Sequence, residues 1–180
     1  MESMIEEILI SEEQIKARIH EMAEEINREY ADKDPVVMGV LKGVVVFYAD
    51  MIREFKFPCQ LDFMWISSYS GTNSTGNMEV KKDMSVDITG RHVLILEDIF
   101  DTGRSLDFTY RHLMSKRPAS LKICTLLDKP ERRDADITLK ADYTGFVIPN
   151  KFVVGYGLDF DEHYRNFPYV GVLKPEAYEK

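Results

Sequence analysis

The turn at residues 101–105, which reads DTGRS, has the residue types that bind a phosphate. Gly103 allows a tight backbone turn, and the residues after it favour a helix. N–H groups at the start of a helix, together with the hydroxyls of Thr102 and Ser105, can hold an anion. The alternative is an ordinary strand-to-helix turn in which Asp101 or Ser105 is the N-cap residue. Taken alone, the turn fits either interpretation.

Two acidic residues just before this turn, Glu97 and Asp98, point to a ligand that also carries a sugar. A carboxylate only accepts hydrogen bonds, so it suits the paired hydroxyls of a ribose, as in dinucleotide-binding folds. Carboxylates also bind Mg²⁺, which usually accompanies phosphates. Asp101 lies slightly apart from the pair and is free for proton transfer. The stretch therefore predicts a ligand that contains both a ribose and phosphates.

The elements that must position these residues alternate between strands and helices. Runs typical of strands occupy residues 36–41, 61–68, 78–84, 92–96, 120–127, 142–149 and 151–157. Helical patterns occupy residues 12–30, 45–55 and 105–117. This alternation predicts a single α/β domain, residues 1–180, with a central, mostly parallel sheet flanked by helices.

The first helix carries the clearest local signal. Ser11 and Gln14 form a capping box, in which the side chain of each residue accepts a hydrogen bond from the backbone N–H of the other. Apolar residues then recur every three or four positions, at Ile15, Ile19, Met22, Ile26 and Tyr30. A stripe with this spacing is typical of a helix face packed on a core, so we assign it no function.

Three polar pairs follow predicted strands: Lys42-Gly43, Glu97-Asp98 and Asp128-Lys129. In parallel sheets, ligands bind at the carboxyl ends of the strands. We therefore expect the three pairs to meet at one site. The segment 68–77, SYSGTNSTGN, consists almost entirely of small turn-forming residues, and we expect it to be a mobile loop.

The composition limits the partners that this chain can have. With 44% hydrophobic and 30% charged residues it is typical of a soluble globular domain. A net charge of −8 disfavours a broad nucleic-acid surface. There is no apolar run long enough to span a membrane, and the acidic start, MESMIEEILI, lacks the basic residues of a signal peptide. We expect Cys59 and Cys124 to be buried free thiols, and a cytoplasmic location.

The acidic pair followed by Asp-Thr-Gly resembles the signature of the phosphoribosyltransferases that use phosphoribosyl pyrophosphate. Between about Val36 and Val172, the chain is similar to the hypoxanthine-guanine branch of that family. The motifs that carry the resemblance are Leu41-Lys42-Gly43, Ser68-Tyr69, VLILEDIFDTGRS at 93–105, LLDKP at 126–130 and KFVVGYGLDFDEHYRNFP at 151–168. The resemblance implies a type I phosphoribosyltransferase fold, with a small hood formed by the chain ends.

The implied reaction transfers phosphoribose from phosphoribosyl pyrophosphate to N9 of hypoxanthine or guanine, with Mg²⁺ as cofactor. Asp101 would be the general base at purine N7. The implied phosphoribosyl pyrophosphate contacts are Glu97, Asp98, Asp101, Thr102, Gly103, Arg104 and Ser105. The implied metal ligands are Glu97, Asp98 and Asp159. We expect Arg104 to act through its backbone.

The same resemblance assigns the remaining site residues. The implied pyrophosphate contacts are Lys42, Gly43 and Arg165, with a non-proline cis peptide in the Leu41-Lys42-Gly43 loop. The implied purine contacts are Lys129, Phe152, Val153 and Asp159, and Ser68 and Tyr69 would lie on a mobile loop that closes during the reaction. Each has a plainer alternative: Lys42 and Lys129 as solvated lysines, Phe152 as core, and Arg165 as a surface charge paired with Asp161 or Glu162.

Other functions compete with this hypothesis. The same chemistry on xanthine or adenine is the nearest, although Lys129, which only donates, argues against the amino group of adenine. A regulator on the same fold that senses phosphoribosyl pyrophosphate or nucleotides is the second. A phosphoacceptor receiver domain is the third, but its pattern needs an acidic pair separate from the phosphorylated aspartate. By resemblance we expect a homodimer or homotetramer, and no nucleic-acid or membrane partner.

Overall fold

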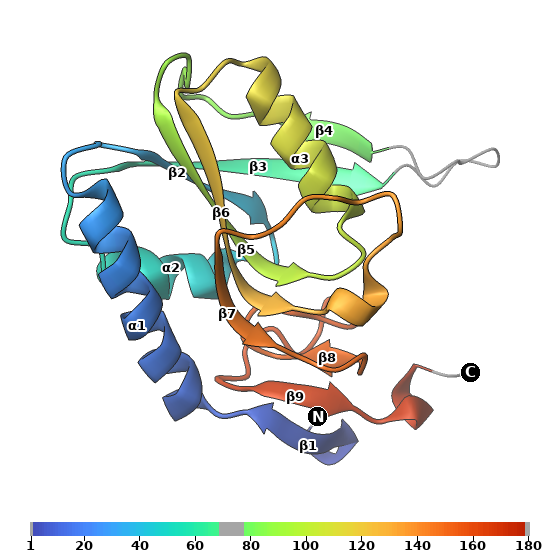
Figure 1. Cartoon of the computed structure of the whole chain (residues 1–180). Helices are drawn as coiled ribbons and strands as arrows, with labels where there is room; N and C mark the ends of the chain where they lie inside the picture. The colour runs from blue at the N-terminus through green and yellow to red at the C-terminus, as the bar shows by residue number, and fades with distance from the viewer. Residues whose placement is uncertain (1, 69–77, 179–180) are drawn as a thin grey trace.

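The computed structural model describes residues 2–68 and 78–178, and its centre is a six-stranded sheet in the order β4-β3-β2-β5-β6-β7 (Figure 1). The strands are β2 (Val36–Leu41), β3 (Gln60–Ser68), β4 (Met78–Lys82), β5 (His92–Phe100), β6 (Ser120–Asp128) and β7 (Tyr143–Val147). Only the edge strand β4 is antiparallel to its neighbour. The predicted mostly parallel sheet is therefore confirmed.

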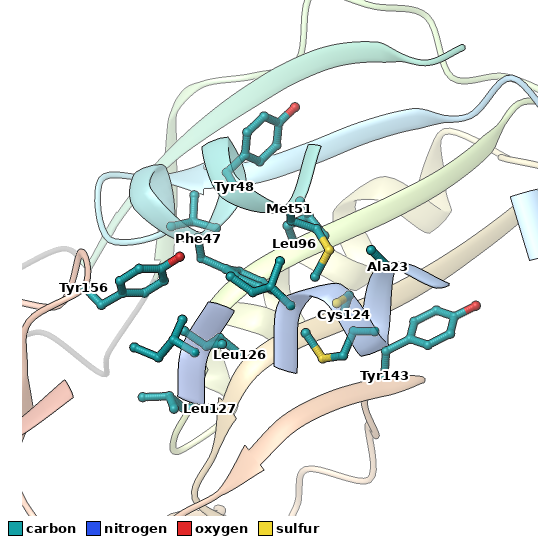
Figure 2. Close-up of a cluster of buried hydrophobic side chains, with 14 of the residues drawn as sticks. Ala23, Phe47, Tyr48, Met51, Leu96, Cys124, Leu126, Leu127, Tyr143 and Tyr156 are labelled. Carbon is teal, nitrogen blue, oxygen red and sulfur yellow. The ribbon is translucent and has the colours of Figure 1, made fainter. Parts of the chain in front are cut away.

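Helices cover both faces of this sheet, which explains why its central strands β2, β5 and β6 are rich in buried apolar residues. Helices α1 (Glu12–Tyr30) and α2 (Val45–Arg53) pack on one face, against alternate residues such as Val37 and Leu94. Figure 2 shows part of this cluster, in which Phe47 and Met51 of α2 meet Leu96 and Leu126 of the sheet. Helix α3 (Arg104–Ser115) packs on the opposite face.

Helix α1 forms as its sequence predicts. Gln14 N donates to Ser11 Oγ at 3.3 Å, and Ser11 N donates to Gln14 Oε1 at 2.8 Å. Both halves of the capping box are thus present. The five predicted core residues of this helix are all buried: Ile15, Ile19, Met22, Ile26 and Tyr30.

A second, three-stranded sheet brings the two chain ends together in the order β1-β9-β8. It contains β1 (Ile5–Ile10), β8 (Val153–Val154) and β9 (Val170–Leu173), all antiparallel. This is the expected hood. Neither β1 nor β9 was predicted from the sequence, and the strand predicted over residues 151–157 is limited to the two residues of β8. Strand β1 pairs with a segment at the other end of the chain, as in Ile5↔Leu173, so no local pattern reveals the pairing.

One boundary was wrong. Strand β5 runs to Phe100 and pairs with β6 as far as Phe100↔Asp128. Glu97 and Asp98 are therefore strand residues, and only Asp101 lies on the turn. The error arose because charged residues usually end a buried strand, whereas here the parallel neighbour continues the hydrogen-bonding ladder.

Two smaller points concern the cysteines and the helices. Both cysteines are free, but only Cys124 is buried, since Cys59 is half-exposed. Among residues 2–68 and 78–178, no helix is both long and apolar enough to cross a membrane.

Candidate active site

A cavity of about 590 Å³ lies where the carboxyl ends of β2, β5 and β6 face the hood. Its lining comes from segments that are far apart in the sequence. The predicted site residues that line it are Lys42, Gly43, Asp98, Asp101, Lys129, Phe152, Val153, Asp159 and Arg165. The three polar pairs expected to converge at the strand ends each contribute at least one residue.

The loop after β2 packs directly against the acidic pair. The peptide bond between Leu41 and Lys42 is cis. A Cβ atom on Gly43 would lie 1.9 Å from Asp98 Oδ2, and a Cβ on Gly157 would lie 2.1 Å from the Gly43 carbonyl oxygen. Both contacts are far shorter than any carbon can make, so the loop lies between Asp98 and Gly157 only because both positions are glycine.

Asp98 lines the cavity, but Glu97 does not. Burial raises the pKa of the Glu97 carboxyl, and the neighbouring Asp98 carboxylate raises it further. Burial also raises the pKa of Asp98, against the opposing effect of a 2.9 Å hydrogen bond from the Ile99 N–H. Glu97 Oε2 is buried and has no hydrogen-bond partner in the described part of the chain. Two carboxyl groups thus lie side by side, and at least one of their oxygens could still accept a hydrogen bond or bind a cation.

The predicted phosphate turn has no side-chain cap. Gly103, with φ 88°, is the N-cap of α3, and among the residues that the structure describes no side-chain hydrogen bond caps this helix. The alternative of an Asp101 or Ser105 cap is thus wrong. Thr102, Gly103, Arg104 and Ser105 adjoin Asp101 but do not line the cavity itself. The side chain of Arg104 pairs with Asp134.

Two residues that the sequence analysis overlooked hold this turn. Arg133 stacks on the buried ring of Phe100, with its guanidinium carbon 3.0 Å from the ring centroid, and bonds to Asp128. Asp134 N donates to the Thr102 carbonyl at 3.0 Å. The signal was present in the charged run ERRD after Lys-Pro, but nothing local in the sequence links that run to the turn.

Asp101 and Lys129 face each other in the cavity. Lys129 is buried, and its Nζ lies 3.8 Å from Asp101 Oδ2 and 2.9 Å from the Lys151 carbonyl oxygen. Burial lowers the pKa of Lys129, and Asp101 partly offsets this. Arg132, which the sequence analysis did not single out, places its Nε 3.3 Å from Asp101 Oδ1. Asp101 Oδ1 nevertheless accepts no hydrogen bond within the described residues.

Phe152 is not part of the core, since it is 38% exposed at the cavity. Tyr178 stacks on it, with ring centroids 4.8 Å apart and an interplanar angle of 20°, and also lines the cavity. The ring of Phe160 meets Phe152 edge-on at 5.6 Å. The sequence analysis found no role for the tail after Leu173, because a tyrosine near a chain end has no motif around it.

Arg165 bridges several acceptors at the rim of the cavity. Its Nη1 lies 3.0 Å from Asp159 Oδ1 and donates to the Gly157 carbonyl at 2.8 Å, while its Nη2 lies 3.3 Å from Glu162 Oε2. Lys42 Nζ lies 3.1 Å from the same Glu162 oxygen. The predicted metal ligand Asp159 is therefore paired with a cation.

The predicted mobile loop is only partly covered. Ser68 is the last residue of β3, where it pairs with Met78. Tyr69 and the rest of the segment to residue 77 lie outside the described residues.

Comparison with known proteins shows the family of this chain. A family model described as the phosphoribosyl transferase domain matches residues 6–161. The chain belongs to the phosphoribosyltransferase family. The predicted resemblance and fold class are thereby confirmed, and the receiver-domain alternative is wrong.

Individual relatives agree with this family assignment. The chain is 49% identical to a Lactococcus lactis protein named hypoxanthine-guanine phosphoribosyltransferase, over 100% of this chain and 97% of that protein. It is 45% identical to a hypoxanthine-guanine-xanthine phosphoribosyltransferase of Tritrichomonas foetus, over 97% of this chain and 94% of the relative. A crystal structure of a Staphylococcus aureus hypoxanthine phosphoribosyltransferase matches with a TM-score of 0.94 and 45% identity, over 100% of this chain and 97% of that one. All three are named as enzymes, so the regulator alternative has no support among them.

Proposed function

We propose that this phosphoribosyltransferase transfers the phosphoribosyl group of phosphoribosyl pyrophosphate to N9 of hypoxanthine or guanine. The products would be the purine nucleotide and pyrophosphate, so the enzyme would serve purine salvage. The observation that carries the proposal is the shared cavity, which gathers the Lys42-Gly43 loop, an acidic strand end, a buried lysine and an aromatic ring. Each of these groups matches one part of the two substrates.

The sugar substrate would occupy the side of the cavity formed by β2, β5 and α3. Asp98, with Glu97 beside it, would accept hydrogen bonds from the ribose hydroxyls. The uncapped start of α3 and the 101–105 turn would bind the 5′-phosphate through N–H groups. Lys42, the Gly43 backbone and Arg165 would bind the pyrophosphate.

The purine would occupy the side next to the hood. Phe152 offers an exposed ring for stacking, and the Val153 backbone lies next to it for the base edge. The buried ammonium of Lys129 would donate to the 6-oxo group. An amino group at that position would place two donors face to face, which explains the expected rejection of adenine.

Asp101 would accept the proton from purine N7 as N9 attacks the sugar. Its Oδ1 has no hydrogen-bond donor in the described structure, so a lone pair is available for this purpose. Positive charge develops on the ribosyl group as the bond to pyrophosphate breaks. The carboxylates of Asp98 and Asp101, which both line the cavity, would stabilise that charge.

The donor set fits Mg²⁺ bound together with its substrate. No group of three or more His, Cys, Asp or Glu side chains within residues 2–68 and 78–178 forms a complete metal cage. Mg²⁺ typically uses one or two carboxylates and takes its other ligands from water and phosphates, which suits the partly unsatisfied Glu97 and Asp98 pair, with Asp159 as a further ligand. When bound, the ion would neutralise charge on the departing pyrophosphate.

The same proposal covers the setting in which the enzyme works. Two free cysteines suit the reducing cytoplasm. We propose that the enzyme acts there, as a homodimer or homotetramer, on small molecules alone. Sedimentation measures the assembly directly.

The test is a direct assay. The protein is mixed with phosphoribosyl pyrophosphate, Mg²⁺ and, in turn, hypoxanthine, guanine, xanthine or adenine, and nucleotide and pyrophosphate are followed. We expect rapid product formation from hypoxanthine and guanine and none from adenine. The rate with xanthine shows how well this third oxopurine is used compared with the other two. No product from any base would refute the proposal. Full activity in excess chelator would refute the role of Mg²⁺.

A further inference from the structure

A single carboxylate oxygen lies between the two cations that we assign to pyrophosphate. Glu162 Oε2 is 3.1 Å from Lys42 Nζ and 3.3 Å from Arg165 Nη2. Lys42 and Glu162 are 120 residues apart in the sequence, so only the fold brings this pair together. The contact places an internal anion at the point where a substrate anion would have to bind.

The backbone around Glu162 holds it in this position. Asp161 and Glu162 have φ values of 51° and 61°, in the left-handed region that non-glycine residues rarely adopt. Glu162 N donates to Asp159 Oδ2 at 2.9 Å, and the backbones of Phe160 and His163 bond to each other in both directions. The turn is therefore a defined structure that presents the Glu162 side chain toward the two cations.

The chemistry of this contact matches that of a phosphate oxygen. Lysine and arginine are common phosphate ligands, and an oxygen shared by both is typical of a bound phosphate. Hydrogen bonds from Lys42 and then Arg165 lower the pKa of Glu162, so its carboxylate is charged at neutral pH. A pyrophosphate that binds both cations would compete with Glu162 for their donors and would meet its negative charge at close range.

We infer that Glu162 is an internal competitor of pyrophosphate, which pairs with Lys42 and Arg165 before the substrate binds and is displaced by it. The inference rests on the proposed function, since it takes the two cations to be pyrophosphate ligands. Glu162 itself does not touch the reacting atoms. Its effect is to weaken the binding of the pyrophosphate group, which also favours release of the pyrophosphate product.

The side chain of Glu162 is 62% exposed, so the effect is modest. Exposed ion pairs contribute little each, but here two pairs and the direct repulsion between carboxylate and pyrophosphate act together. We expect removal of the charge to tighten pyrophosphate binding roughly three- to tenfold.

The experiment compares the wild-type enzyme with Glu162→Gln, which keeps the shape and removes the charge. Glu24→Gln is the matched control, because Glu24 on α1 is also a surface glutamate paired with a lysine, Lys56, away from the cavity. Pyrophosphate binding in the presence of Mg²⁺ is measured by titration calorimetry. The KM values for phosphoribosyl pyrophosphate and for hypoxanthine are measured on the same samples.

We expect Glu162→Gln to bind pyrophosphate more tightly and to lower the KM for phosphoribosyl pyrophosphate by a similar factor, with the KM for hypoxanthine unchanged. Glu24→Gln should match the wild type in all three. Glu162→Asp, which keeps the charge on a shorter side chain, should give an intermediate value, and it serves as the test if the Gln variant does not fold. Unchanged or weaker pyrophosphate binding in an otherwise active variant would overturn the inference alone. A wild-type enzyme that neither binds pyrophosphate nor forms nucleotide would overturn the proposed function and the inference with it.

Discussion

At the scale of single residues, the site combines groups whose ordinary properties are altered by burial. Lys129 is a buried cation with few acceptors, and burial lowers its pKa. Asp101 has an oxygen that accepts no hydrogen bond in the described structure. A buried polar group without a full set of partners is costly to the fold, so such groups usually mark a place where a ligand completes the bonding.

The role of Asp101 as base gives the first prediction. Asp101→Asn keeps the shape of the side chain but removes its ability to take a proton. We expect kcat to fall roughly 10²- to 10⁴-fold. The affinity for phosphoribosyl pyrophosphate, measured by calorimetry, should change little. Asp107→Asn, on the nearby helix α3 and paired with Arg111, is the control. Equal losses in binding and turnover would contradict the assignment.

The second prediction concerns selection of the base. Lys129→Ala should lower kcat/KM for hypoxanthine roughly 10²-fold or more, because the 6-oxo group loses a buried donor. Binding of phosphoribosyl pyrophosphate should stay close to wild type. Steady-state kinetics with hypoxanthine and guanine test this, with the exposed Lys140→Ala as control. Unchanged hypoxanthine kinetics would rule out the contact.

At the scale of elements, the site depends on how closely neighbouring segments approach. The loop after β2 lies against the end of β5, since Gly43 has no side chain to separate them. The turn before α3 is held by Arg133 and Asp134, which follow β6. Contacts between the segments that follow three strands thus fix the geometry of the cavity wall.

The approach of Gly43 to Asp98 can be tested by adding one carbon. In Gly43→Ala the new Cβ would lie 1.9 Å from Asp98 Oδ2, so either the loop or the carboxylate must move. We expect kcat/KM to fall at least about 100-fold, because small displacements of binding groups are costly. Thermal unfolding should show that the variant remains folded. Near-normal activity would mean that the loop position is unimportant.

The C-terminal segment gives a fourth prediction. Tyr178 supports the ring of Phe152 by stacking, and aromatic pairs of this kind contribute about 0.5–1.5 kcal/mol. Tyr178→Ala should therefore raise the KM for hypoxanthine about two- to tenfold and leave the KM for phosphoribosyl pyrophosphate unchanged. Tyr178→Phe keeps the ring and should behave as wild type. A change in the sugar substrate's KM instead would point to another role.

At the scale of the whole molecule, the two sheets contribute different residues to the cavity. The strands of the six-stranded sheet and the loops after them supply the acidic and lysine residues of the cavity, whereas Phe152 and Val153 come from the hood (Figure 1). The cavity exists only when the hood is docked on the main sheet. Helix α1 directly follows the hood strand β1 and packs on the six-stranded sheet. Contacts between α1 and this sheet therefore help to hold the hood in place.

Glu29 makes one such contact and leads to a pH prediction. Partial burial would raise the pKa of Glu29, but hydrogen bonds from Lys122 and Tyr143 outweigh it and lower the pKa to about 2. Because the folded pKa lies below the unfolded value of 4.5, the stabilisation is fully present above about pH 4.5 and is lost as the pH falls toward 2. After allowance for solvent screening, Glu29→Gln should lower the free energy of unfolding by about 1–2 kcal/mol at pH 7.

Urea unfolding of wild type and Glu29→Gln between pH 7 and pH 3 measures this difference. The gap should narrow below about pH 4.5. Glu25→Gln, an exposed neighbour on the same helix, gives the baseline. A gap that stays constant with pH would show that packing, and not charge, is responsible.

Features that depend on residues close together in the sequence could be predicted without the fold. The capping box of Ser11 and Gln14, the apolar stripe of α1 and the apolar runs of the buried strands are all of this kind. The run from Glu97 to Ser105 joins its chemical groups within nine residues. The convergence of three polar pairs was also predictable, since parallel strands must align their carboxyl ends.

Contacts between segments that are far apart in the sequence could not be predicted and are seen only in the folded structure. Sequence order does not show that Glu162 reaches Lys42, that Tyr178 stacks on Phe152, or that Arg133 lies on Phe100. It also does not show that β1 pairs with β9, because each strand is too short to reveal its partner. The physical reason is that these contacts depend on the path of the whole chain. Without the tertiary structure, each of these residues looks like an ordinary surface or core residue.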